Sequence, residues 1–119
     1  MKEKLVRTEC PVETAMLLIS NKWKIFVLHE LLSGTRRFNE LLRAIPSISQ
    51  KVLTQNLRSM EEDGLVIREI FAEVPPRVEY TLSDLGTTLT PVIDALEKWG
   101  TRYRDSIFNG DLPSSSYGS

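Results

Sequence analysis

The sequence predicts a mainly α-helical fold that carries a small β-hairpin, an α+β class, on the basis of three observations. Residues 49–63 place apolar side chains on one face of a helix and polar side chains on the other. A shorter amphipathic segment, residues 38–45, comes before it and ends at Pro46, which cannot continue a helix. Downstream, residues 65–72 and 77–82 alternate in polarity as two strands around a proline-containing turn.

Two further helices are expected before these segments. The first runs from Pro11 to about Ser20, because proline suits the first helical position and Asn21 interrupts the pattern. The second, residues 23–32, is the most apolar helix of the chain and ends at Gly34. The side chains expected to pack toward the following helices are Ile25, Phe26, Leu28, Leu31 and Leu32.

The middle of the chain is expected to form two helices joined by a tight turn. Asn39 is the expected N-cap of the shorter helix, and the next helix is expected to start at Ser47 or Ser49. Residues 73–76 form the turn of the hairpin, and residues 35–37 form an extended piece that can pair as its third strand. Helix, turn, helix and hairpin in this order are a winged helix-turn-helix.

The C-terminal segment, about residues 83–108, returns to helical spacing. Ser83 is its expected N-cap, and Pro91 either kinks the helix or splits it in two. The segment has more apolar surface than one small winged domain needs, so we expect it to form a homodimer interface. The expected interface residues on this segment are Leu89, Val92, Ile93, Leu96, Trp99 and Tyr103.

Length and composition agree with a single domain. The chain has 119 residues, of which 41% are hydrophobic and 26% charged. We expect a domain at residues 10–108, an N-terminal arm at residues 1–9 and a disordered, serine-rich tail at residues 109–119. No apolar run is long enough to span a bilayer, and the first residues lack the apolar region of a signal peptide. A cytoplasmic protein with no membrane partner is therefore expected.

The formal net charge of −1 hides a strong asymmetry along the chain. Residues 21–60 have seven cations and two anions, a net charge of +5, whereas residues 61–119 have a net charge of −6. The basic charge therefore falls on the predicted helix-turn-helix. This distribution matters more than the total, because counterion release depends on which cations meet phosphates.

The polar face of the helix at residues 49–63 has the side chains of a helix that lies in a DNA groove. Arginine and lysine suit phosphates and guanine edges, glutamine suits adenine edges, and threonine serves either. A mixed polar face is often simply solvated, but the flanking elements favour DNA binding. The expected groove-reading residues are Gln50, Lys51, Thr54, Gln55 and Arg58, with double-stranded operator DNA as the partner.

Four more residues are expected to contact DNA, either at the phosphates or through the wing: Arg36, Arg37, Ser49 and Arg77. Arg77 follows two prolines at the end of the wing turn, where a fixed backbone would direct a cation at the minor groove or its phosphates. Arg36 and Arg37 would meet the backbone beside the groove, although for either one a merely solubilising role is as good an explanation. Arg68 is expected to pair with a carboxylate across the hairpin.

Other chemistries find little support in the sequence. A single cysteine, Cys10, and the absence of a Cys/His cluster exclude a disulfide framework and a conventional zinc site, and no cofactor is predicted. No nucleophile with a base and no phosphate loop is visible, so an enzyme is not expected. Trp23 and His29 are interpreted as structural. The alternative is a winged-helix protein-interaction module, which would more often have apolar or acidic residues at positions 51, 54, 55 and 58.

From Cys10 to Trp99 the sequence resembles the HxlR-type family of bacterial transcriptional regulators, relatives of the MarR winged-helix group. The motifs that carry this resemblance are CPVETAMLLI, NKW, RFNELLRAIPSIS, KVLTQNLRSMEEDGLVIR, PPRVEYTLSDLG and LTPVIDALEKWG. The resemblance implies a homodimer built by the terminal helices, about residues 10–20 with Met16 in the interface and about residues 83–108. It also implies a recognition helix over residues 50–60 and an operator near a promoter. One departure is Ser47, where members of the family often have glycine.

Several members of this family use a cysteine just ahead of the first helix as a redox or electrophile sensor, and Cys10 occupies that position. The helix dipole favours a thiolate there, whereas Glu9 and Glu13 oppose it. The resemblance thus implies a response to redox or electrophile stress through Cys10. Two alternatives stay open: Cys10 is a small packing residue without a signalling role, or a small-molecule effector gates the regulator instead.

Overall fold

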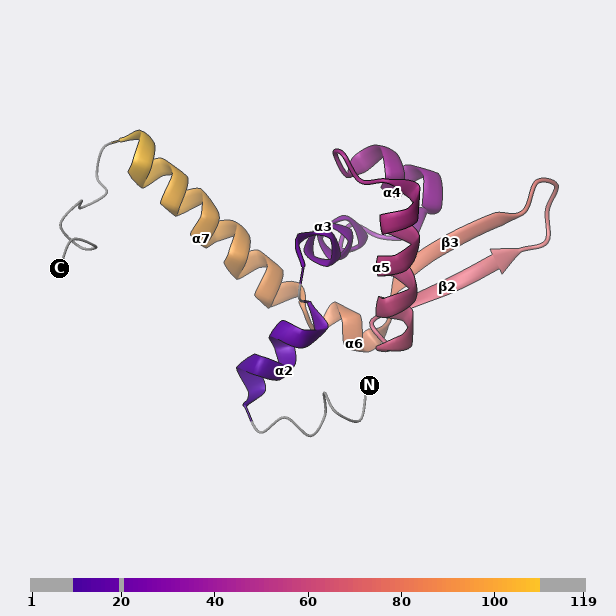
Figure 1. The fold of residues 1–119 in the computed structure, drawn as a ribbon, viewed down its shortest axis with the longest axis horizontal. Coiled ribbons are helices and arrows are strands. Elements are labelled where there is room, and N and C mark those ends of the chain that lie inside the picture. The colour runs from indigo at the N-terminus through magenta and orange to yellow at the C-terminus, as the bar shows by residue number, and fades with distance from the viewer. Residues whose placement is uncertain (1–9, 20, 110–119) are drawn as a thin grey trace. The chain divides into compact units, whose positions relative to one another are not determined.

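The computed structural model describes residues 10–19 and 21–109 (Figure 1). They form two compact units that divide between Leu89 and Thr90, and each unit is described by itself. The expected arm at residues 1–9, the end of the first helix at Ser20 and the tail from residue 110 lie outside the described residues. The elements are, in order, α2 (Pro11–Leu18), α3 (Lys22–Leu31), β1 (Arg36–Arg37), α4 (Phe38–Ala44), α5 (Gln50–Glu62), β2 (Val66–Phe71), β3 (Arg77–Leu82), α6 (Asp84–Thr87) and α7 (Thr90–Phe108).

The first unit has the predicted winged helix-turn-helix architecture. Helices α3, α4 and α5 pack together against an antiparallel three-stranded sheet of order β1-β3-β2. Strand β1 pairs Arg36 with Tyr80, and β2 pairs Val66 with Leu82, so the extended piece before α4 is the predicted third strand. The β2–β3 hairpin projects from the lower end of α5 in Figure 1 and is the wing.

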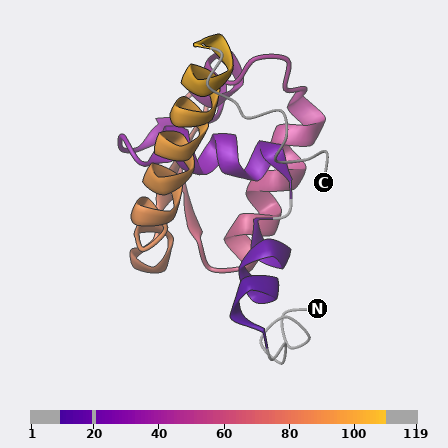
Figure 2. The ribbon, with the colours of Figure 1, turned by 90° about the vertical axis from the view of Figure 1, so that its left-hand side faces the viewer.

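The core of this unit lies where α3 runs across α5 (Figures 1 and 2). Helix α3 buries a stripe at helical spacing that includes Val27, Leu28 and Leu31. The predicted packing of Phe26 into the core is wrong, since its side chain is 43% exposed. Phe26 lies beside the buried stripe and contacts the ring of Trp23 edge-to-face at 6.0 Å. From α5 the core receives the predicted apolar face, Leu53, Leu57 and Met60.

Side-chain caps fix where two of the helices begin. Asn21 accepts a hydrogen bond from the Lys24 backbone N–H at 3.0 Å and so starts α3. Ser49, and not Ser47, starts α5, because its hydroxyl accepts a hydrogen bond from the Val52 N–H at 3.1 Å. Ser47 instead has a positive φ of 66°, the left-handed conformation for which glycine is the better residue.

The predicted N-cap of α4, Asn39, is wrong by two positions. Helix α4 begins at Phe38, directly after strand β1, and its N-cap position is occupied by Arg37. The Glu40 carboxylate accepts a hydrogen bond from the Arg37 backbone N–H at 2.7 Å. The chain enters the helix early because strand pairing ends at Arg37 and leaves no loop for a separate capping residue.

A compact junction joins the end of α5 to the end of the wing. Helix α5 ends at Glu62, and Gly64, two residues later, has a φ of 80° that allows the N–H of Leu65 to reach the Met60 carbonyl at 2.9 Å. The Ser83 hydroxyl donates to the Gly64 carbonyl at 2.5 Å and caps α6 by accepting from the Gly86 N–H. A Cβ at Gly86 would collide with the Leu65 carbonyl oxygen. Through this junction β3 and α6 are fastened to the C-terminal end of α5.

The second unit contains α7, one helix of 19 residues. The predicted helix at residues 83–108 is split, but the break falls at Thr88 and Leu89 and not at Pro91, which lies in the first turn of α7. A proline is tolerated there because the first helical N–H groups have no intrahelical partner. None of the helices in the described part of the chain is both long and apolar enough to cross a membrane.

Candidate nucleic-acid interface

The polar face of α5 brings together all five predicted groove-reading residues. Four of the side chains, Gln50, Lys51, Gln55 and Arg58, are exposed, and Thr54 is half-buried. The five residues line one shallow depression of the surface. The opposite face is anchored in the core, so the rotation of α5 about its axis is fixed by burial.

The cations on this face have no counter-ion among the described residues. Lys51 and Arg58 form no ion pair there, and the nearest carboxylate along the helix, Glu61, is paired with another residue. The Thr54 hydroxyl donates to the Gln50 carbonyl at 2.8 Å, which leaves its oxygen free to accept. The Ser49 hydroxyl accepts the Val52 N–H, which leaves its hydrogen for an acceptor such as a phosphate oxygen.

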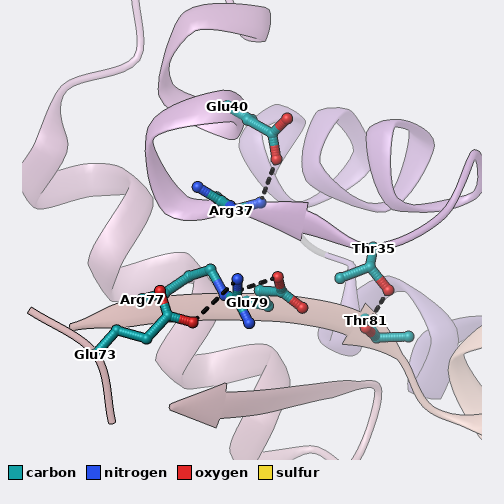
Figure 3. Close-up of polar contacts among 7 residues, drawn as sticks. All are labelled: Thr35, Arg37, Glu40, Glu73, Arg77, Glu79 and Thr81. Atoms are coloured by element: carbon teal, nitrogen blue, oxygen red, sulfur yellow. Dashed lines mark hydrogen bonds and ion pairs between the residues drawn. The ribbon is translucent and has the colours of Figure 1, made fainter. Parts of the chain in front are cut away.

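The two arginines of β1 lie on opposite faces of the strand, as strand geometry requires. Arg37 is exposed, and Arg36 is half-buried, with its guanidinium 3.5 Å from the Thr35 carbonyl that accepts its hydrogen bond. Thr35 and Thr81 share a hydroxyl–hydroxyl hydrogen bond of 2.8 Å (Figure 3). Arg37 lines a cleft of about 720 Å³ between α4 and the wing turn. Arg43, which the sequence analysis did not single out, lines the same cleft.

The wing arginine, Arg77, is held by neighbouring side chains (Figure 3). Its Nη1 lies 3.1 Å from Glu73 Oε2, and its Nε lies 3.2 Å from Glu79 Oε2. The guanidinium carbon also lies 4.1 Å from the centre of the Phe71 ring. Two carboxylates and a ring therefore contact the guanidinium, so Arg77 is not an unpaired cation in this conformation. Contact of Arg77 with DNA stays a prediction.

The partner predicted for Arg68 is also wrong. Its Nε lies 3.4 Å from Glu61 Oε1, a carboxylate at the end of α5 and not one across the hairpin. The cross-strand neighbour of Arg68 is Tyr80. Burial raises the pKa of the Tyr80 hydroxyl above its ordinary value of 10.0, although the charge of Arg68 opposes this shift. Tyr80 is therefore neutral and adds no charge to the interface.

The residues predicted for the dimer interface are mostly exposed. Met16, Val92, Leu96, Trp99 and Tyr103 are exposed, and Leu89 is half-buried. On α7 the rings of Trp99 and Tyr103 stack with their centres 5.3 Å apart. Ile93, in contrast, is already buried in the single chain and offers little surface to a partner. The interface itself stays a prediction.

Cys10 lies directly before α2, where it occupies the N-cap position with an exposed side chain. Its carbonyl accepts the Thr14 backbone N–H at 3.0 Å, so the cysteine is fixed to the first turn of the helix. Within residues 10–19 and 21–109, no group of three metal-ligating side chains is close enough to hold an ion.

Comparison with known proteins identifies the family. Residues 18–108 match the family described as HxlR-like helix-turn-helix. The chain belongs to the HxlR-like helix-turn-helix family. This confirms the resemblance drawn from the sequence motifs, and the chain is a helix-turn-helix transcriptional regulator.

Relatives of this HxlR-like regulator agree in sequence and in fold. It is 47% identical over 98 residues to the uncharacterized HTH-type transcriptional regulator YdeP of Bacillus subtilis, which covers 82% of this chain and 77% of YdeP. The reduced form of the redox regulator HypR is 42% identical, with a TM-score of 0.79 over 84% of this chain and 99% of HypR. HypR has also been solved in an oxidised form. A transcriptional regulator of the MarR family from Porphyromonas gingivalis W83 is 40% identical, with a TM-score of 0.76 over 78% of this chain and 91% of that one.

Proposed function

We propose that this HxlR-like regulator binds operator DNA as a homodimer, with the polar face of α5 in the major groove. The observation that carries the proposal is the exposed basic and amide face of α5, whose two cations have no counter-ion among the described residues. A B-DNA major groove admits one α-helix, and these side-chain types match base edges and phosphates. The protein-interaction alternative does not account for a face of this composition.

The proposed contacts fall into two groups. Base edges are assigned to the five residues of the α5 depression, Gln50, Lys51, Thr54, Gln55 and Arg58. Backbone contacts are assigned to the Ser49 hydroxyl, to Arg36 and Arg37 on β1, and to Arg77 on the wing. Phosphate contacts fix the register of the protein on the duplex, and base contacts specify the sequence.

The dimer is assigned to the exposed apolar side chains of α2 and α7. On α7 they form one stripe at helical spacing that includes Leu96, Trp99 and Tyr103, and on α2 Met16 is exposed. A stripe of this size exposed to water favours self-association. Two recognition helices related by a twofold axis would read half-sites about 34 Å apart.

Cys10 is assigned as the redox-responsive residue. In support, Cys10 is exposed at the start of α2, and HypR, a redox regulator, has been solved in reduced and oxidised forms. With diamide as the oxidant, two Cys10 thiols of a dimer would form one disulfide, and their two electrons and two protons would reduce the diazene bond. Such a crosslink would change the spacing of the two recognition helices and hence operator affinity.

A mobility-shift titration tests the DNA-binding proposal. The probe is the DNA upstream of the regulator's own gene, at 50 and 200 mM salt, with wild type and Arg58→Ala. We expect specific binding that weakens with salt, and a loss of about tenfold or more in the variant, since a base-reading arginine contributes about 1–3 kcal/mol. If no genomic fragment is bound more tightly than random DNA, the proposal fails and the interaction module becomes the better explanation.

The redox assignment is tested separately with Cys10→Ser, which keeps the side-chain shape. Wild type and variant are titrated on the same operator before and after diamide, and a non-reducing gel records the disulfide. We expect diamide to change the affinity of wild type only. An equal response of both proteins would contradict the role of Cys10 and leave DNA binding untouched.

A further inference from the structure

The two carboxylates around Arg77 hold different ends of its guanidinium. Glu79 forms an ion pair, without a hydrogen bond, at Nε, the nitrogen nearest the backbone, whereas Glu73 lies at Nη1 at the tip. The ring of Phe71 lies against the guanidinium at 4.1 Å. Arg77 is thus contacted by a strand residue and a ring, and its tip is neutralised by Glu73 of the wing turn. Figure 3 shows the two carboxylates beside Arg77.

These carboxylates also differ in how firmly they are placed. Glu79 lies inside β3, which pairs with β1 on one side and β2 on the other, and its side chain is 23% exposed. Glu73 lies in the turn, outside the strand pairing, where its backbone N–H donates a 2.8 Å hydrogen bond to the Phe71 carbonyl. Its side chain is 49% exposed. An ion pair this exposed is weak and exchanges easily with another anion.

We propose that Glu73 is an internal competitor for a DNA phosphate. In the free protein its carboxylate occupies the tip of Arg77, and on binding a phosphate of the DNA backbone takes its place while Glu79 and Phe71 keep the arginine in position. The proposal rests on the DNA-binding function proposed above and adds a residue that tunes it. Because phosphate contacts carry no sequence information, the masking of Arg77 lowers the sequence-independent part of the affinity.

The surroundings of the pair suit such an exchange. Glu73 and Arg77 line the cleft between the wing turn and α4, and the opposite wall contains the exposed cations Arg37 and Arg43. The one other carboxylate of this lining, Glu40, already accepts the Arg37 backbone N–H. An incoming phosphate therefore enters a cleft whose lining has three cations and two carboxylates, and it needs to displace only one of these carboxylates.

The test compares Glu73→Gln with Glu69→Gln on operator and on random-sequence duplexes. Glu69 is a matched control, because it is exposed on the same hairpin, directly opposite Glu79, and forms no ion pair with any described residue, so its substitution leaves Glu73 on the tip of Arg77. Both substitutions remove one negative charge, but only Glu73→Gln frees the tip of Arg77. We expect Glu73→Gln to bind both duplexes about three to ten times more tightly at 50 mM salt. The slope of the logarithm of the binding constant against the logarithm of the salt concentration should become steeper by about 0.9 for each wing that gains a phosphate contact. Glu69→Gln should change the affinity by less than twofold.

A second pair of variants assigns the gain to Arg77. The increase should disappear in Glu73→Gln/Arg77→Gln relative to Arg77→Gln alone. Equal gains for both glutamine variants, or a gain that survives without Arg77, would overturn the proposal. Circular dichroism melts verify that each variant is folded, and Glu73→Ala replaces Glu73→Gln if the latter melts early. Failure of wild type to bind DNA would refute the proposed function, whereas wild-type binding without a difference between the variants refutes only the role of Glu73.

Discussion

Helix α5 and the wing both have basic side chains, but these cations are in opposite electrostatic states. On α5, Lys51 and Arg58 are exposed and have no ion-pair partner among the described residues. On the wing, Arg68 pairs with Glu61, and Arg77 pairs with Glu73 and Glu79. The comparison teaches that the number of cations in a region does not measure the charge available to a phosphate.

The difference follows from secondary structure. Along α5 the acidic residues come only in the last turn, one turn beyond Arg58, and Glu61 pairs with Arg68 of β2 and not with a cation of α5. A hairpin brings the charges of neighbouring strands and of the turn within a few ångströms of one another. The hairpin therefore compensates Arg77 with carboxylates of its own turn and strand, whereas Arg68 is compensated by Glu61 of α5.

The largest expected effect comes from breaking the junction that holds the two regions together. Gly86→Ala should lower the free energy of unfolding by about 3 kcal/mol, because the new Cβ would collide with the backbone oxygen of Leu65, which cannot move without moving the end of α5. Thermal unfolding measures this loss. Gly100→Ala is the matched control: it meets no atom within 4 Å in α7 and should stabilise the helix by up to about 1 kcal/mol. Equal melting of the two variants would show that the junction is not close-packed.

The next effect compares the two regions directly. Arg58→Ala should weaken operator binding by about 1–3 kcal/mol, because a free base-reading arginine is lost. Arg77→Ala should weaken it by well under 1 kcal/mol, because a phosphate contact made by Arg77 first requires the loss of an existing ion pair. Mobility-shift titrations of both variants at the same salt concentration decide the order. A larger loss for Arg77→Ala would mean that the wing, and not α5, dominates the affinity.

The smallest effects concern the turn that leads into α5. Ser47→Gly should raise the free energy of unfolding by about 0.5 kcal/mol, since glycine accepts the positive φ of 66° without a Cβ penalty. Ser49→Ala, two residues later, should lower it by about 1 kcal/mol, because the hydrogen bond to the Val52 N–H is lost. Urea titrations resolve changes of this size. The same sign for both would contradict the assignment of Ser49 as the cap.

Local patterns sufficed to predict most of the fold and the reading face. The spacing of Leu53, Leu57 and Met60 determined which side of α5 is buried, and with it the side that presents Lys51 and Arg58. The alternation of side-chain polarity with a period of two residues predicted the hairpin, and the family motifs indicated the helix-turn-helix. These features depend on residues within a few positions of each other, which is why a single sequence reveals them.

Tertiary structure alone decided which cations are paired with carboxylates and which side chains of the helices are buried. The pairing of Arg68 with Glu61, the support of Arg77 by Phe71 and the exposure of Phe26 each depend on where another element lies. The spacing of apolar residues gives the direction in which a side chain points from the axis of its own helix or strand. The partner of that side chain, in contrast, is set by packing between elements far apart in the chain. The sequence by itself therefore determined α5 and its exposed basic face, and the folded wing decided which of its own cations are already paired with carboxylates.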